Sequence, residues 1–141
     1  GIEKQVHFLG NVDHTRLPNF FAAADIVVQP SIAEARSLAC LEAMASGSAI
    51  IATATGGLPE LITHKDNGYL IDPFQVSTYD VTTYTEDGVQ RLATAVIEVL
   101  SDETLRASLQ KRARETSLQY SWQEIAKKTL AVYQEAIHMH S

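Results

Sequence analysis

The chain has 141 residues, 45% hydrophobic and 20% charged, which is the profile of one globular domain or of part of a larger one. Its net charge of −6 argues against sequence-independent binding to nucleic acid, which needs clustered lysine and arginine. The single cysteine, Cys40, excludes an internal disulfide and a cysteine zinc site.

Four short runs rich in β-branched residues predict strands at residues 6–10, 25–30, 48–53 and 68–72. The middle two are almost continuously apolar, as strands covered on both faces are. Helical spacing predicts helices over 17–24 and 38–45. Pro59 predicts the start of a short helix, because the first turn of a helix does not need the N–H group that proline lacks. This alternation predicts an α/β fold, with a Rossmann-like parallel sheet and flanking helices.

The second half of the chain has a different pattern. Residues 73–87 are polar and rich in turn formers, which predicts a surface loop. From about residue 88 the apolar spacing predicts three consecutive helices, and Ser121 with Glu124 predicts a capping box at the start of the last one. We therefore expect one domain over residues 1–141, helical in its C-terminal part.

The first residues lack the basic region and long apolar core of a secretory signal, and no apolar run reaches the roughly 20 residues of a membrane helix. We expect a cytoplasmic protein. Strand-like sequence begins after only a few residues, which is what we expect of a piece of a longer chain. There is no GxGxxG and no GxxxxGK[ST] motif, so neither a dinucleotide fingerprint nor a P-loop is predicted.

The strongest sign of a functional site lies between Gln29 and Glu42. A strand is expected to end at Pro30 and a helix to begin near Ser37, and parallel sheets bind ligands beyond the carboxyl ends of their strands. The helix start offers free N–H groups that suit phosphate. Glu34 before the helix and Glu42 within it can each accept hydroxyl protons. The pattern predicts a site for a sugar, a diphosphate and a ribose in a row.

These residues resemble the family-4-type retaining glycosyltransferases of the GT-B fold. Pro30-Ser31, Glu34, seven intervening residues and Glu42 resemble the E-x7-E signature of that family. The resemblance covers nearly the whole chain in order, through further elements at 6–10, 24–25, 43–47, 50–53, 56–60, 67–70, 121–122 and Tyr133.

The resemblance implies the C-terminal, donor-binding domain of such an enzyme, apparently truncated at its amino-terminal side. In that domain Glu34 would be the catalytic residue, bonded to hydroxyls of the donor sugar, and Glu42 would bind the ribose hydroxyls. Backbone amides would face the sugar and diphosphate, and the loop after residue 9 would border the base. The backbone amides are those of Ser37, Leu38 and Ala39. The loop residues that would border the base are Gly10, Asn11 and Val12.

The activity implied is transfer of a sugar from a UDP-, GDP- or ADP-sugar to a carbohydrate or lipid acceptor, with retention of anomeric configuration. No metal and no cofactor is expected. The partner would be the missing N-terminal domain of the same chain, without which this piece would be inactive. The family resemblance also implies contact with the inner face of a membrane.

A departure from the family pattern at residues 36 and 37 leaves an alternative open. Arg36 and Ser37 stand where the family has an aromatic residue and then glycine, and a serine there narrows the space for a ligand. The alternative is a non-catalytic α/β interaction or regulatory module on a degenerate scaffold. Arg36 either contacts phosphate or is an exposed cation. The Gly56-Gly57 pair either cradles a ligand or forms a strand-to-helix turn with positive φ.

Overall fold

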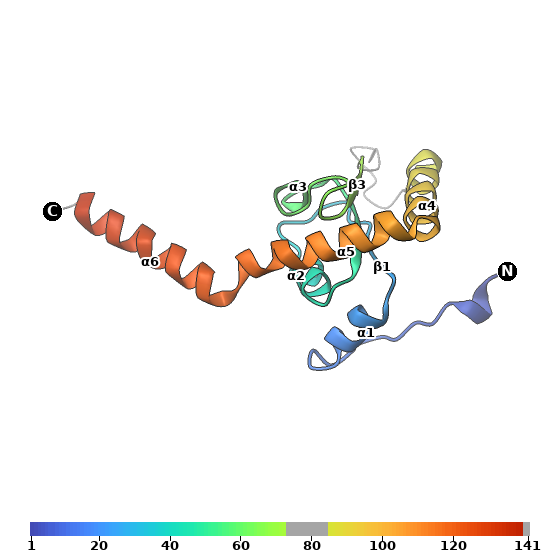
Figure 1. Cartoon of the computed structure of the whole chain (residues 1–141), viewed down its shortest axis with the longest axis horizontal. Coiled ribbons are helices and arrows are strands. Elements are labelled where there is room, and N and C mark those ends of the chain that lie inside the picture. The colour runs from blue at the N-terminus through green and yellow to red at the C-terminus, as the bar shows by residue number, and fades with distance from the viewer. Residues whose placement is uncertain (73–84, 140–141) are drawn as a thin grey trace.

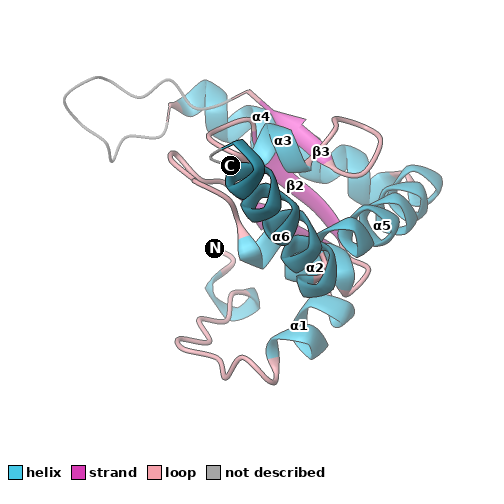
Figure 2. Ribbon diagram, turned by 90° about the vertical axis from the view of Figure 1, so that its left-hand side faces the viewer, coloured by secondary structure: helices cyan, strands magenta, loops and turns pink. Residues whose placement is uncertain are grey.

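A parallel three-stranded sheet in the order β1-β2-β3 forms the centre of the computed structural model, which describes residues 1–72 and 85–139. The strands are Ile26–Gln29, Ala49–Thr53 and Tyr69–Ile71. All residues of β2 are buried, because β2 has a strand on each side and helices on both faces (Figure 2). The predicted Rossmann-like α/β fold is confirmed.

Helices connect and cover these strands (Figure 1). The α-helices are α1 (Leu17–Ala23), α2 (Leu38–Ala45), α3 (Leu58–Leu61), α4 (Glu86–Ser101), α5 (Glu103–Ser117) and α6 (Trp122–Met139). Two short 3-10 helices, η1 (Glu3–Gln5) and η2 (Leu118–Tyr120), complete the described elements. The three predicted helices after the last strand are thus confirmed, and none of the described helices is long and apolar enough to cross a membrane.

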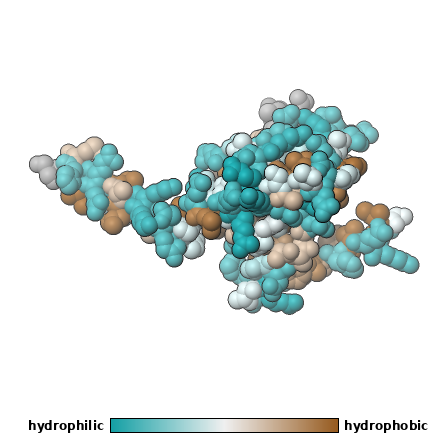
Figure 3. Space-filling view, in the orientation of Figure 1, coloured by the Kyte–Doolittle hydropathy of each residue, from teal (hydrophilic) through white to brown (hydrophobic). Residues whose placement is uncertain are grey.

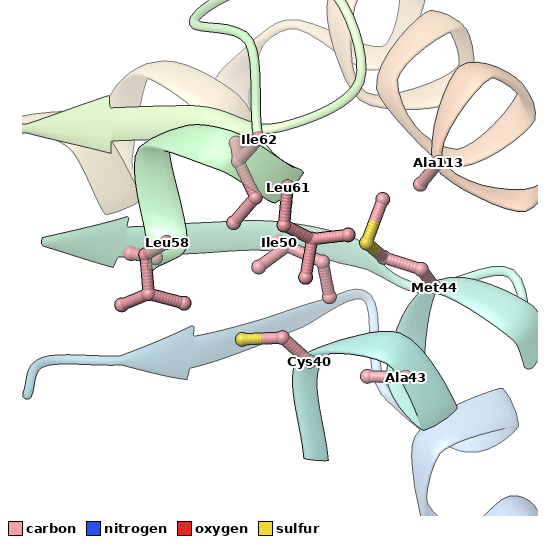
Figure 4. Close-up of a cluster of buried hydrophobic side chains, with 9 residues drawn as sticks. Cys40, Ala43, Met44, Ile50, Leu58, Leu61, Ile62 and Ala113 are labelled. Carbon is pink, nitrogen blue, oxygen red and sulfur yellow. The ribbon is translucent and has the colours of Figure 1, made fainter. Parts of the chain in front are cut away.

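The core has one apolar cluster on each face of the sheet, because successive side chains of a strand point to opposite faces. Ile50 and Ala52 of β2 pack on the α2 and α3 side, where Met44 and Leu58 are also fully buried (Figure 4). On the other side, residues of β2, β3, α4 and α5 form the second cluster: Ala49, Ile51, Ile71, Ala95, Val99 and Leu109. The sheet and α2 are therefore held rigidly from both sides, which fixes the strand ends and the start of α2.

The predicted strand at residues 6–10 is wrong. The backbone at Val6 is extended, but no residue of this segment belongs to a strand, and the side chain of Phe8 is 96% exposed. The segment runs away from the sheet toward the amino terminus (Figure 1). The apolar pattern gives the local preference for an extended backbone, whereas a strand also needs a neighbouring edge with which to form hydrogen bonds.

Two helix starts differ in detail from their predictions. Residues 73–84 of the predicted loop lie outside the described residues. The last two residues of that predicted loop, Glu86 and Asp87, are helical, because the Thr85 hydroxyl caps α4 by accepting a 3.1 Å hydrogen bond from the N–H of Gly88. At the start of α6, the Ser121 hydroxyl accepts from the N–H of Glu124 at 3.3 Å. The Glu124 carboxylate binds Lys127 instead of closing the reciprocal half of the capping box.

Helix α6 extends from the body and buries none of its described residues (Figure 1). Six of its large apolar residues are exposed: Trp122, Leu130, Val132, Tyr133, Ile137 and Met139. Apolar patches along this helix are visible in Figure 3.

Cys40 provides a direct test of the packing between α2 and the sheet. The thiol is buried in the cluster of Figure 4, and burial raises the pKa of Cys40 above its ordinary value. We expect Ellman's reagent to label Cys40 at least about 100-fold more slowly in native buffer at pH 8 than in guanidinium, because the attacking thiolate is both disfavoured and shielded. Equal labelling rates in the two solutions would show that α2 is not packed as described.

Candidate functional site

The loop from Pro30 to Ser37 joins the carboxyl end of β1 to α2, and the segment that ends β2 holds it. The Thr53 hydroxyl donates to the carbonyl oxygen of Ser31 at 2.5 Å, and the Thr55 hydroxyl donates to that of Ile32 at 3.0 Å. The N–H of Gly57 donates to the carbonyl oxygen of Glu34 at 3.1 Å. Three bonds from one neighbouring segment therefore fix the backbone that carries Glu34.

The Gly56-Gly57 pair makes this close approach possible. Gly56 has a φ of +53°, and a Cβ built there would lie 1.6 Å from the carbonyl oxygen of Glu34. A Cβ on Gly57 would lie 2.1 Å from the carbonyl oxygen of Ala35. Of the two interpretations of this pair, the structure shows the turn with positive φ, which is packed directly against the Glu34 loop.

The side chain of Glu34 is half-buried and contacts Gln29, the last residue of β1. Gln29 Nε2 donates to Glu34 Oε2 at 3.3 Å and to the Ser31 hydroxyl at 2.7 Å. A carboxylate held in this way keeps lone pairs for hydroxyl groups of a ligand. The sequence prediction missed Gln29, although a polar residue that closes an apolar strand run was a usable signal.

The start of α2 is capped and accessible. Ser37 is 3% exposed, and its hydroxyl accepts from the N–H of Cys40 at 3.2 Å. Its side chain is therefore the N-cap of α2, and serine at this position satisfies one of the free N–H groups of the helix end. Leu38 and Ala39 are the first two helical residues, whose N–H groups have no acceptor within the helix, and both residues are exposed. Unpaired N–H groups at an accessible helix start suit an anionic ligand.

Glu42 lies one turn into α2 and contacts the loop that precedes α1. His14 Nε2 and Glu42 Oε1 are 3.0 Å apart, although 28 residues separate them in sequence. His14 belongs to the segment after residue 9, in which Gly10 and Asn11 are exposed and Val12 is half-buried. The contact therefore links Glu42, the residue predicted to bind the ribose, to the loop that also contains the residues predicted to border the base.

Arg36 is directed toward α3 and η2. Its Nη2 lies 3.3 Å from Glu60 Oε2, and its guanidinium carbon lies 5.9 Å from the centre of the Tyr120 ring. Its side chain is half exposed, as expected of an exposed cation, and is paired with Glu60.

Other chemistry-bearing groups lie apart from this site. A hollow of about 520 Å³ between β3 and α4 is lined in part by Tyr69, Asp72 and Arg91, on the opposite side of the sheet from α2, and contains none of the predicted site residues. Over residues 1–72 and 85–139, no group of three or more histidine, cysteine, aspartate or glutamate side chains is placed to hold a metal ion.

An α/β domain with a parallel sheet and a helix that begins just beyond the carboxyl end of a strand belongs to the Rossmann-like class. The family model of the glycosyl transferases group 1 matches residues 1–116. The chain therefore belongs to the group 1 glycosyltransferases.

Individual relatives agree with this assignment. An uncharacterized glycosyltransferase of Methanocaldococcus jannaschii is 34% identical over 140 residues, which is 99% of this chain and 33% of the relative. The structure of sucrose-phosphate synthase from Thermosynechococcus elongatus superposes with a TM-score of 0.80 at 29% identity, over 98% of this chain and 32% of that one. The structure of HepE from Anabaena in complex with UDP-glucose superposes with a TM-score of 0.68 at 28% identity, over 83% of this chain and 28% of that one. The chain spans about a third of the length of the curated relatives it matches.

Proposed function

We propose that this chain is the donor-binding, C-terminal domain of a family-4-type retaining glycosyltransferase with the E-x7-E motif. It would take a nucleotide-diphosphate sugar as donor and, joined to an N-terminal domain, transfer the sugar to a carbohydrate or lipid acceptor. The observation that carries the proposal is that Glu34 lies in the loop before α2 and Glu42 one turn into α2, with the exposed first residues of that helix between them in the chain. The UDP-glucose bound to HepE, a structural neighbour, supports this donor class.

The roles proposed for the residues follow from their positions. Glu34 binds hydroxyls of the transferred sugar, the N–H groups of Leu38 and Ala39 face the diphosphate, and Glu42 binds the ribose. Gly10, Asn11 and Val12 border the base. No metal or cofactor enters the proposal.

The proposed transfer needs no acid–base pair from this domain. The acceptor oxygen forms a bond to the anomeric carbon while the bond from that carbon to the diphosphate breaks, and the acceptor proton passes to a phosphate oxygen of the leaving group. The chain's own contribution is positioning and electrostatic stabilisation of the leaving diphosphate. The acceptor-side groups would come from the N-terminal domain, which explains why this domain alone should be inactive.

A cytoplasmic location is part of the proposal. Contact with the inner face of a membrane stays a prediction.

Calorimetric titration of the full-length enzyme with UDP-glucose, GDP-glucose and ADP-glucose tests the proposal. We expect the Kd of one of these nucleotide sugars to be at least about tenfold lower than the Kd of the other two, because the site distinguishes the bases. The same titration followed by amide NMR should shift signals of residues 10–12 and 34–42. Absence of binding by all three nucleotide sugars would favour the non-catalytic module instead.

A further inference from the structure

His14 lies in a turn that its neighbours hold in one conformation. Asp13 Oδ1 accepts from the N–H of Thr15 at 2.8 Å and from the Thr15 hydroxyl at 2.5 Å, and the N–H of Arg16 donates to the Asp13 carbonyl oxygen at 2.9 Å. The hydrogen bonds from Thr15 lower the pKa of Asp13, so this side chain keeps the charge that makes it a good acceptor. A turn closed by its own aspartate in this way has few alternative conformations.

The turn is also fixed relative to α2. It leads directly into α1, where the Ser48 hydroxyl donates to the carbonyl oxygen of Phe21 at 2.6 Å and the Phe21 side chain packs on the core cluster that contains Met44. Because Met44 belongs to α2, the same contacts hold α1 against that helix. His14 therefore reaches Glu42 from a scaffold built on the core.

The bond between His14 and Glu42 uses only one of the two carboxylate oxygens. Because an ionised carboxylate only accepts hydrogen bonds, His14 Nε2 is the donor and Glu42 Oε1 the acceptor, at 3.0 Å. Among the residues that the structure describes, Glu42 Oε2 has no hydrogen-bond partner. The side chain of His14 is 79% exposed, so the bond contributes little to folding stability.

We propose that His14 is a positioning residue for nucleotide binding: it holds the Glu42 carboxylate so that Oε2 is presented to the ribose hydroxyls. This inference rests on the proposed function, because it assumes that Glu42 binds the ribose. A glutamate side chain that is free to rotate must be ordered when the nucleotide binds, and that ordering weakens the observed affinity. A hydrogen bond that orders the carboxylate in advance removes part of this cost.

Two variants separate positioning from a structural role. His14→Ala should raise the Kd of the nucleoside diphosphate about fivefold in the full-length enzyme, the scale expected of one partly exposed hydrogen bond to a carboxylate. His14→Gln should recover most of the affinity, because the glutamine Nε2–H can donate to the same carboxylate oxygen. His138→Ala, which removes an exposed histidine from α6, is the matched control and should leave the Kd unchanged.

The decisive measurement repeats these titrations with the 2′,3′-dideoxy form of the same nucleotide, whose ribose offers no hydroxyl to Glu42. If His14 acts through Glu42, the fivefold loss in His14→Ala disappears with this ligand, as in any cycle that removes one partner of a coupled pair. An equal loss with both ligands, no loss with either, or no recovery in His14→Gln overturns the inference. Failure of the unsubstituted enzyme to bind any nucleotide overturns the proposed function itself.

Discussion

The Glu42→Ala variant should bind its nucleotide sugar about 100-fold more weakly than the unsubstituted enzyme. The carboxylate would accept hydrogen bonds from ribose hydroxyls, and hydrogen bonds to a charged group contribute about 1.5–3 kcal/mol each. A net loss of about 3 kcal/mol corresponds to roughly that factor in Kd. Stability should change little, because Glu42 is half exposed in the middle of α2 and alanine favours a helix.

Isothermal calorimetry on the full-length enzyme gives the Kd, and urea unfolding checks the stability. The matched control is Glu115→Ala on α5, which removes a partly exposed helical glutamate paired with Arg112 at 3.0 Å. It should leave the Kd unchanged. If the two variants bind the nucleotide sugar equally well, Glu42 does not contact the donor and the ribose assignment must be abandoned.

The strands β1, β2 and β3 could be predicted from sequence because local composition and tertiary environment agree there. A strand such as β2, buried on both faces, has to be apolar throughout, so its run is visible without knowledge of its neighbours. Residues 6–10 have the same local composition and form no strand. Pairing depends on where other segments lie, and a local pattern contains no information about them.

In the candidate site, too, the features that depend on local sequence could be predicted and those that depend on the tertiary arrangement could not. The positions of Glu34 in the loop before α2 and of Glu42 within α2 could be predicted because one strand end, one loop and one helix start are consecutive in the chain. The partners of these two residues could not. His14 reaches Glu42 through the packing of α1 on α2, and Gly57 reaches Glu34 because β1 and β2 are neighbours in the sheet. Contacts of this kind arise from the tertiary arrangement and have no signature in residue spacing.

Ser37 shows how the structure changes the meaning of a sequence difference. The sequence presents a serine in place of glycine, which predicts a narrower ligand site. The structure turns that side chain onto the N–H of Cys40, where it caps α2. The hydroxyl group that the sequence comparison counted against ligand binding therefore stabilises the start of α2, where we propose that the diphosphate binds.

The Gly56→Ala variant should lose about 3 kcal/mol of folding free energy together with most of its affinity for the nucleotide sugar. A residue with a side chain pays about 1–2 kcal/mol for the left-handed conformation, which Gly56 adopts at φ +53°. The new Cβ would also lie 1.6 Å from the carbonyl oxygen of Glu34. That oxygen belongs to the backbone and accepts from the N–H of Gly57, so relief of the overlap requires movement of the whole Glu34 loop.

Gly47→Ala is the matched control, because Gly47 also has positive φ, at +87°, but a Cβ there would meet no atom within 4 Å. Only the conformational cost applies, so we expect a loss of about 1–2 kcal/mol and an unchanged Kd. Urea unfolding and calorimetry on both variants separate the two effects. Equal destabilisation by the two substitutions would show that the turn at Gly56 is not packed against the Glu34 loop. A destabilised Gly56→Ala variant with full affinity would show that this loop does not carry the donor site.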